Sequence, residues 1–298
     1  MTFSLSTSGN MQSMSKIMLQ PAIENVEPAG PMNALVTRAE IPKGHYQIDV
    51  PLWHRMTASS LSEGVDMANP TALTATVRTV TASEHGLLSF ISNRLKHQNN
   101  EDVLAEVGVQ HGRGLGRLLD NDLLTLVDGF SNTAPGASNA ATWLHITGAI
   151  SFLRTDDDSN FGPAPSMPSA VLNPEQIRRL AQEATGMQSA GTTAAAQPMP
   201  DGPGADVLKR YIRNRDPLFG VPIYEDGNIS NDSGGDAKGG VFVKEALFLA
   251  VEKEINGADE DDISLRGTEV VTTGVWGETE IVDSWGVEIF SAADPVFS

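Results

Sequence analysis

The sequence predicts an α+β fold in which helical segments separate two strand-rich regions. Apolar residues alternate with polar ones between residues 46 and 77, recur at helical spacing between 101 and 154, and return in short runs after residue 241. A strand turns successive side chains to opposite faces, whereas a helix returns to one face every 3.6 residues, so the two periods separate the two structures. With 298 residues, 40% of them hydrophobic, the chain is long and apolar enough to bury a core.

Residues 1–33 are expected to form an extended arm without a core of its own. They are rich in Ser, Met, Asn and Pro and show little periodicity. Such an arm is either disordered or ordered by lying on a neighbouring subunit. Residues 1–20 contain no apolar h-region, which argues against a secretory signal and against export.

Residues 34–83 are predicted to contain a long β-hairpin. Two alternating runs are separated by a polar stretch, with an open tip between His54 and Pro70. Pro51 is compatible with a strand only at an edge or a bulge, and a two-stranded ribbon has too little core to be stable alone. The ribbon is therefore expected to lean on a partner. The apolar positions are Tyr46, Ile48, Val50 and Leu52 in the first run and Leu73, Ala75 and Val77 in the second.

Two helices are predicted next. Ser83 is placed to cap a helix from Glu84 to His97, whose apolar face would comprise Leu87, Leu88, Ile91 and Leu95. A longer helical pattern covers residues 101–130, but it contains Gly108, Gly112, Gly114 and Gly116. Each glycine costs about 1 kcal/mol relative to Ala inside a helix, so the long helix is expected to bend or to begin properly only near Arg113.

The central region mixes helices, short strands and loops. A helix is predicted over Asn139–Arg154, a loop over 155–169 and a short buried strand at 170–172. Asn173 and Pro174 then start another helix, because Asn is a favoured cap and Pro is tolerated at the first helical position. Further expected elements are a loop at 186–204, a short helix at 205–214, an apolar strand at 218–224 and a loop at 227–235.

The last sixty residues or so are predicted to be mainly strands. Apolar runs occupy 241–243 and 247–251, and alternation is seen at Ile263 and Leu265 and again at Val287 and Ile289. The glycines at 274, 277 and 286 are expected to mark the turns between these runs.

The composition excludes several classes of function. The absence of cysteine removes disulfides, thiolate metal sites and cysteine nucleophiles, and fits a reducing cytosol. The formal charge of −18 argues against a protein that grips nucleic acid by its phosphates. This charge suits a soluble protein, or a wall that must not adhere to packed DNA. No apolar run approaches the length of a membrane span.

No catalytic, cofactor-binding or metal-ligating residue is predicted. Residues 111–117 resemble a dinucleotide-binding loop, but the third glycine position is Arg117 and no clear strand precedes it. The six histidines are scattered without an HExxH spacing, which argues against zinc. The paired Trp276-Gly277 and Trp285-Gly286 are interpreted as core or interface packing.

Three acidic segments are candidates for cation sites. The carboxylates of Asp156, Asp157 and Asp158 point in different directions unless a loop folds around them, so a solvated loop is the favoured interpretation. Residues 226–236 are rich in oxygen ligands but lack the Glu of a calcium loop, and 259–262 is interpreted as a solvated turn. A metal-dependent hydrolase using Asp156–Asp158 is the weakest alternative.

The order of elements and several local segments resemble the Hong Kong 97 fold of tailed-bacteriophage major capsid proteins. Residues 168–177 look like the family's strand, Asn-Pro and helix segment, and 218–224 are similar to its FGvPv strand. Residues 239–251 resemble its glfhkdAlglAv stretch, and 270–277 with 285–289 resemble its closing strands. The N-terminal half matches by layout only.

This resemblance implies a division of the chain and a structural role. It implies an α+β chain that is not an enzyme and assembles as pentamers and hexamers into an icosahedral or prolate head shell around double-stranded DNA. The implied parts are an N-terminal arm (1–33), an extended hairpin loop (34–83), a peripheral domain with a long spine helix (84–138), an axial domain (139–255) and the closing strands of the peripheral domain (256–298).

The resemblance also implies partners. They are other copies of the chain, a scaffolding protein, a portal and decoration proteins, with no cofactor, no membrane and no sequence-specific DNA contact. The protein would reside in the virion after assembly in the host cytoplasm. Some relatives carry an N-terminal coiled-coil scaffolding segment that is absent here, which implies a separate scaffold or a chain already trimmed. An encapsulin-like compartment shell is the main alternative.

Overall fold

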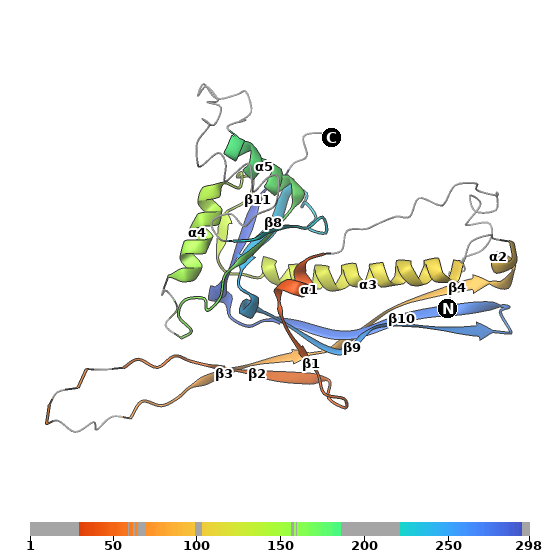
Figure 1. Cartoon of the computed structure of the whole chain (residues 1–298), viewed down its shortest axis with the longest axis horizontal. Helices are drawn as coiled ribbons and strands as arrows, with labels where there is room; N and C mark the ends of the chain where they lie inside the picture. Colours follow the sequence, from red (N-terminus) through yellow and green to blue (C-terminus); the bar gives the residue numbers. More distant parts are fainter. Residues whose placement is uncertain are drawn as a thin grey trace.

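The computed structural model describes residues 30–58, 60–61, 63–64, 70–98, 103–155, 158, 160–185 and 221–293. In this part of the chain a long helix lies along a long sheet, a second sheet with two helices stands at one end, and a two-stranded ribbon projects beyond it (Figure 1). Residues 1–29 of the predicted arm, the loop at 186–204 and the helix at 205–214 lie outside the described residues.

The first sheet has the strand order β1-β9-β10-β4. Its long strands β9 (Leu247–Asp262) and β10 (Gly267–Glu280) are antiparallel and joined by a turn at 263–266, while β1 (Thr37–Glu40) pairs with the start of β9 in parallel. The predicted strand at Ile263 and Leu265 is therefore wrong, since both residues lie in the turn. Gly274 and Gly277 lie inside β10 and do not mark turns. An added Cβ at Gly277 would lie 2.3 Å from the carbonyl oxygen of Thr81, so this glycine permits a close approach of two strands.

The predicted helix at 84–97 is also wrong over most of its length. Residues Ser83–Ser92 form strand β4, which pairs with β10 from Ser83 opposite Trp276 to Ser92 opposite Gly267, and only α2 (Asn93–Gln98) is helical. Leu88 is 59% exposed whereas Ile91 is 1% exposed, so the apolar residues do not share one buried face. Pairing along β10 overrides a local pattern that also fits a helix.

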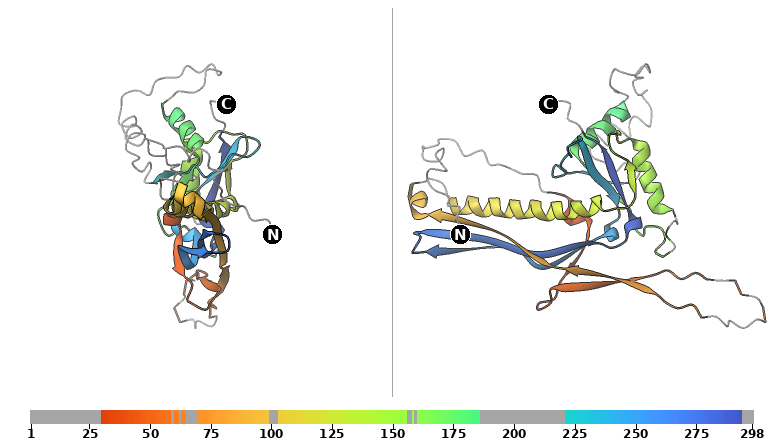
Figure 2. Two further views of the ribbon diagram at one scale, coloured as in Figure 1. Left: turned by 90° about the vertical axis from the view of Figure 1, so that its right-hand side faces the viewer. Right: turned by 180° about the vertical axis from the view of Figure 1, so that it is seen from behind.

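The helix α3 (Val103–Asp128) is continuous over 26 residues and runs along the long sheet (Figure 2). The expectation of a bend or of a start near Arg113 is wrong. Its buried face, which includes Leu115, Leu123 and Val127, packs against the sheets, and this tertiary packing stabilises the helix despite its glycines.

The second sheet has the order β5-β11-β8-β6-β7. Its strands are β5 (Thr133–Pro135), β6 (Ser169–Leu172), β7 (Ile223–Glu225), β8 (Asp236–Phe242) and β11 (Gly286–Ala292). The apolar runs at 241–243 and 247–251, which are adjacent in sequence, thus belong to different sheets and are separated by the short helix η1 (Lys244–Ala246).

Two helices accompany this second sheet. The helix α4 (Trp143–Arg154) begins later than the predicted Asn139, because Thr142 forms a capping box with His145. The strand at 170–172 and the helix α5 (Pro174–Thr185) are confirmed, and the Asn173 side chain accepts the N–H of Glu175 at 2.8 Å, as expected for a cap.

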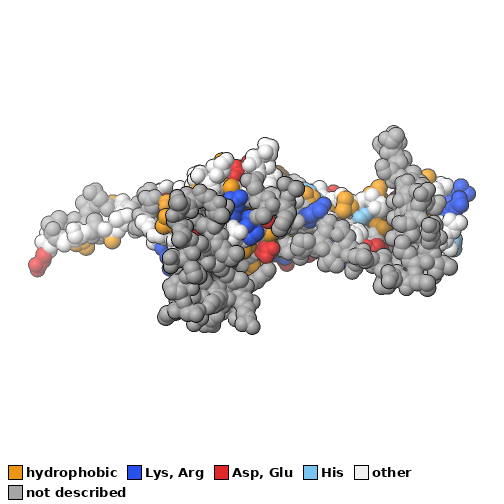
Figure 3. Space-filling view, turned by 90° about the horizontal axis from the view of Figure 1, so that it is seen from above, with side chains coloured by type: hydrophobic (Ala, Val, Ile, Leu, Met, Phe, Trp, Pro, Cys, Tyr) orange, Lys and Arg blue, Asp and Glu red, His pale blue; other side chains and the backbone are white. Residues whose placement is uncertain are grey.

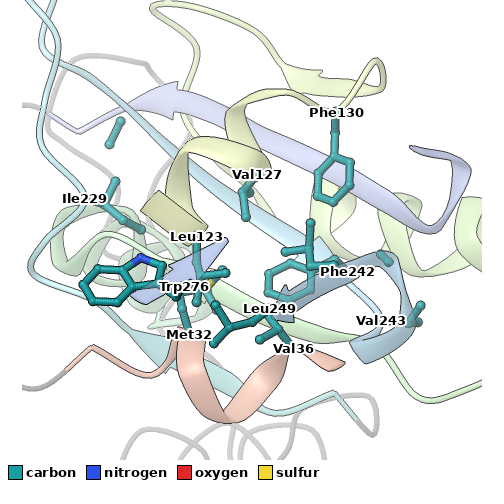
Figure 4. Close-up of a cluster of buried hydrophobic side chains, with 14 of the residues drawn as sticks. Met32, Val36, Leu123, Val127, Phe130, Ile229, Phe242, Val243, Leu249 and Trp276 are labelled. Carbon is teal, nitrogen blue, oxygen red and sulfur yellow. The ribbon is translucent and has the colours of Figure 1, made fainter. Parts of the chain in front are cut away.

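One buried cluster joins α3 to both sheets (Figure 4). The short helix α1 (Met32–Leu35) contributes Met32, and Trp276 closes the cluster on the side of the first sheet. A second cluster lies between α4 and the second sheet. Figure 4 labels Met32, Val36, Leu123, Val127, Phe130, Ile229, Phe242, Val243, Leu249 and Trp276.

The predicted hairpin is confirmed. Strands β2 (Gln47–Trp53) and β3 (Ala75–Thr81) are antiparallel, with Gln47 opposite Thr81 and Trp53 opposite Ala75. We call these two strands the ribbon. It projects away from the body of the molecule (Figure 1).

Two Gly→Ala substitutions should have opposite effects on stability. Gly108→Ala in α3 should raise the free energy of unfolding by roughly 0.5–1 kcal/mol, because an added Cβ meets nothing within 4 Å and Ala is the better helix former. Gly240→Ala in β8 should lower it by about 1–3 kcal/mol, because the added Cβ would lie 2.3 Å from Cγ1 of Val127. Urea denaturation of the purified subunit measures both. A loss of stability in both variants would contradict the open environment assigned to Gly108.

Candidate assembly surfaces

The acidic segment 156–158, for which a solvated loop is predicted, has a structural role at the one residue of the three that the structure describes, Asp158. Asp156 and Asp157 lie outside the described residues. The carboxylate of Asp158 accepts the N–H of Asn160 at 2.7 Å and the hydroxyl of Ser284 at 2.7 Å. Burial alone would raise the pKa of Asp158, but its hydrogen bonds and the charge of Arg55 outweigh this effect, so the pKa is lowered.

This Asp158 turn supports the ribbon at the end of β2 that leads to the hairpin tip. The carbonyl of Asn160 accepts the N–H of Arg55 at 2.8 Å, and the ring of Phe161 meets that of His54 edge-on at 5.3 Å. Phe161 also contacts Trp285, whose indole N–H donates to the carbonyl of Gly162 at 3.0 Å. The loop therefore braces the ribbon where the strand β2 ends, so the acidic segment has a mechanical role.

The other acidic segments also hold their own backbone. Asp232 accepts the N–H groups of Gly234 and Asp236 at 2.8 and 2.9 Å, and Asp236 accepts the N–H of Ser138 at 2.8 Å. Residues 259–262 end the strand β9 and are not themselves a turn, but Asp262 accepts the N–H of Ser264 in the turn that follows. Among the residues that the structure describes, no three His, Asp or Glu side chains are grouped to hold a metal ion.

Residues 111–117, which resemble a dinucleotide loop in sequence, lie in the middle of α3. His111 is 7% exposed, and its two ring nitrogens lie 2.7 Å from the hydroxyl of Ser89 and 3.2 Å from that of Thr272. Burial lowers the pKa of His111, so the neutral ring is favoured. It ties α3 to β4 and β10. The sequence offered no signal for this role, because both partners are distant along the chain.

The ribbon presents apolar side chains on both of its faces. On the inner face, Ile48, Val50 and Leu52 pack beside a buried cluster at the base that includes Val80, which is 1% exposed. On the outer face, Pro51 lies opposite Val77 and Trp53 lies opposite Ala75. We call these last four residues the outer patch.

The outer patch faces solvent in the isolated chain. Trp53 is 61% exposed and Val77 is 56% exposed. Tyr46, Met56, Leu61 and Leu73, in the flanking segments of the same hairpin, are also more than half exposed. Contiguous exposed apolar surface of this kind is typical of protein interaction sites.

A second apolar area lies at the opposite end of the molecule, where β4, α2 and the turn at 263–266 meet. Leu88 is 59% exposed, Ile263 is 91% exposed and Leu265 is 50% exposed. The same end carries an ion pair, in which Nζ of Lys96 in α2 lies 3.7 Å from Oδ1 of Asp261 in β9. Basic side chains are visible at this end from above (Figure 3). The chain thus carries exposed apolar side chains at both extremities.

No family model matches the sequence, and no curated protein sequence matches it. None of the helices in the described ranges is long and apolar enough to cross a membrane. The comparison with solved structures, by contrast, finds many similar chains.

These similar chains come from phage heads and related particles. A chain in the head structure of Helicobacter pylori bacteriophage KHP40 has a TM-score of 0.69 at 13% identity, with 98% of this chain and 99% of that chain covered. A chain of Mycobacterium phage Che8 has a TM-score of 0.66 at 13% identity, with 92% and 97% covered. The capsid of a native GTA particle gives 0.65 at 11% identity, with 97% and 100% covered. The predicted α+β fold of the Hong Kong 97 type is thereby confirmed over nearly the whole chain.

Two matched substitutions in β3 test how the ribbon is held. Val80→Ala should lower the free energy of unfolding by about 2 kcal/mol, because it removes two buried methyl groups and leaves a cavity at the ribbon base. Val77→Ala should change it by less than about 0.5 kcal/mol in the isolated subunit, because Val77 is exposed. Urea denaturation gives both values, and trypsin cleavage near Arg55 and Arg78 should accelerate only in Val80→Ala. Equal effects of the two substitutions would refute the two-faced description of the ribbon.

Proposed function

We propose that this chain is the shell-forming subunit of a tailed-phage head, and that its function is assembly and not catalysis. The observation that carries the proposal is the full-length likeness to phage head chains, combined with a ribbon whose outer patch is apolar and exposed in the isolated chain. Copies of the subunit would gather as pentamers and hexamers into an icosahedral or prolate shell around double-stranded DNA.

The physical argument starts from the ribbon. Two strands cannot bury enough apolar surface to be stable alone, and only the inner face of this ribbon is covered by its own chain. A neighbouring subunit that covers Trp53 and Val77 would bury their exposed apolar surface, and each Å² buried would stabilise the contact by about 25 cal/mol. Permanent shells use large obligate interfaces, which are more apolar than transient ones.

The heterologous contacts of a shell suit an elongated subunit with apolar areas at both ends. A contact between two different patches closes into rings when the rotation fits, and the rings supply the capsomers. We also propose for the chain the division that the resemblance implies. The ribbon belongs to the extended loop at 34–83, α3 to the peripheral domain at 84–138, and α4 and α5 to the axial domain at 139–255, while 1–33 form the arm and 256–298 the closing strands.

The charge of the chain is consistent with enclosing DNA without gripping it. A formal charge of −18 repels phosphates, so the shell would contain the genome without sequence-specific contacts. The further partners proposed are a scaffolding protein, a portal and decoration proteins. The virion is the proposed location, after assembly in the host cytoplasm. The similar structures are phage heads and a GTA capsid, so the encapsulin-like and hydrolase alternatives are not favoured.

Assembly should depend on the outer patch. The purified full chain, produced together with the genes that adjoin it, should form shells or capsomers visible by negative-stain microscopy. Trp53→Ala should raise the critical concentration for assembly by about tenfold or more, because a buried aromatic anchor is worth about 2 kcal/mol or more at an interface.

The matched control is Gln47→Ala, an exposed polar position on the same face of the same strand. This variant should assemble like the unsubstituted chain, and both variants should keep the unfolding midpoint of the subunit. A chain that stays monomeric under every assembly condition would contradict the proposal. Equal assembly of Trp53→Ala and Gln47→Ala would remove the outer patch from it.

A further inference from the structure

Two buried carboxyl groups meet where three parts of the fold converge. Asp120, in the C-terminal half of α3, is 3% exposed, and Asp226, in the loop after β7, is 2% exposed. The chain enters the described region just beside them, at Gly30 and the helix α1. An added Cβ at Gly30 would lie 1.8 Å from Cγ of Asp120, so the backbone there lies directly against the Asp120 carboxylate.

The two carboxyl groups receive different numbers of hydrogen bonds. Asp120 accepts the N–H of Met32 at 3.2 Å through one oxygen and the side-chain amide of Asn228 at 2.9 Å through the other. Asp226 accepts the N–H of Asn228 at 2.8 Å through Oδ1. Its other oxygen, Oδ2, is buried and has no hydrogen-bond donor among the described residues. An ionised carboxylate with one unpartnered oxygen in this position would be costly.

We propose that Asp226 carries a proton on its free oxygen and donates it to Asp120, so that the pair forms a latch between the loop after β7 and the helix α3. The latch opens when this one proton is released to solvent, because the two buried carboxylates then repel each other. This inference concerns the isolated chain and does not depend on the proposed shell function.

The charged surroundings favour the protonated pair. Burial raises the pKa of Asp226 to about 7, the N–H of Asn228 opposes this, and the hydrogen bond and charge of Asp120 add to the rise. The helix α1 brings no charged residue to the site. On α3 the neighbouring charged residues are Arg117, which is exposed, and Asp122, which accepts the indole N–H of Trp276. Further along the loop, Asp232 and Asp236 accept backbone N–H groups.

The latch would join the second sheet to the helix α3. Asp226 donates its own N–H to the carbonyl of Leu172 in β6 at 3.0 Å, and Ile229 of the same loop packs in the cluster that contains Leu123. The side chain of Asn173 holds the carbonyl of Ile229 at 2.7 Å. Release of the proton should therefore loosen residues 226–231 and the entry of the chain at 30–36, while the sheets keep their own pairing.

Stability against pH tests the latch. A carboxyl whose pKa is higher in the folded chain than in the unfolded chain stabilises at low pH, and this contribution is lost as the pH rises through the folded value. With the value of about 7, the Asp226 contribution to the unfolding equilibrium constant should increase about thirtyfold between pH 5.5 and pH 8.5. Other groups titrate as well, so the readout is the difference between the unsubstituted chain and Asp226→Asn, whose amide donates to Asp120 at every pH.

The stability of Asp226→Asn should fall less steeply between pH 5.5 and pH 8.5 than that of the unsubstituted chain. Asp226→Asn should therefore be the more stable protein at pH 8.5. The matched control, Asp259→Asn at an exposed position of β9, should leave the slope unchanged. Once the intrinsic base-catalysed rate is divided out, protection from hydrogen exchange at residues 226–231 and 30–36 should fall above pH 8 only where Asp226 is present. An unchanged slope in Asp226→Asn overturns the proposal, and so does a slope abolished by EDTA, since a bound cation would then hold the pair.

A measurement on the unsubstituted chain keeps the test decisive if Asp226→Asn fails to fold. With ¹³C-labelled Asp, one side-chain carboxyl resonance should titrate between pH 6 and pH 8. In Asp120→Asn that resonance should titrate at a lower pH, because the negative charge of Asp120, which raises the pKa of Asp226, is gone. The absence of any Asp carboxyl that titrates in this range overturns the latch.

Discussion

Burial of one face of α3 against both sheets is the interaction on which the rest of the structure depends. Leu123 and Val127 are fully buried, and they share a cluster with Phe242 of the second sheet and Leu249 of the first. At about 25 cal/mol per Å² of apolar surface, this shared layer is the main force that holds the two sheets together. The helix α3 thereby joins a long thin sheet and a compact one into a single body.

The long shape of the molecule explains why so much apolar surface remains outside that core. The long sheet is narrow, and the ribbon extends beyond it (Figure 2). Side chains near the two extremities therefore remain largely exposed, as at Trp53 and Ile263. In the shell that we propose, other copies would cover these side chains, so stability and assembly would be parts of one process.

Most of the polar residues that the sequence analysis singles out hold loops and helices in place by hydrogen bonds. Asp158 braces the loop under the ribbon, Asp232 closes a turn, and His111 ties the spine to the first sheet. Each has its hydrogen-bonding partners, as buried polar groups generally do. Asp226 differs, because one of its buried oxygens has no donor, and the proposed proton resolves that exception.

The sequence by itself determined the elements whose signals are local. Alternation revealed the ribbon, the Asn173-Pro174 pair revealed the start of α5, and the helical repeat revealed α3, because capping and amphipathic periodicity act within a few residues. The absence of a recognisable catalytic motif could also be read from the sequence. The resemblance of the C-terminal segments supplied the overall fold.

Tertiary structure alone decided the rest. The pattern at 84–92 fits a helix as well as a strand. The pairing of ten residues of β4 with β10 makes the segment a strand. The glycines of α3 predicted a bend that packing against two sheets prevents, and those of β10 predicted turns where backbones in fact approach closely. Asp120 and Asp226 are distant in the chain, so no local pattern could pair them. These outcomes depend on which segments meet in space. That is decided by packing and pairing between residues that are far apart in the sequence, which local patterns do not record.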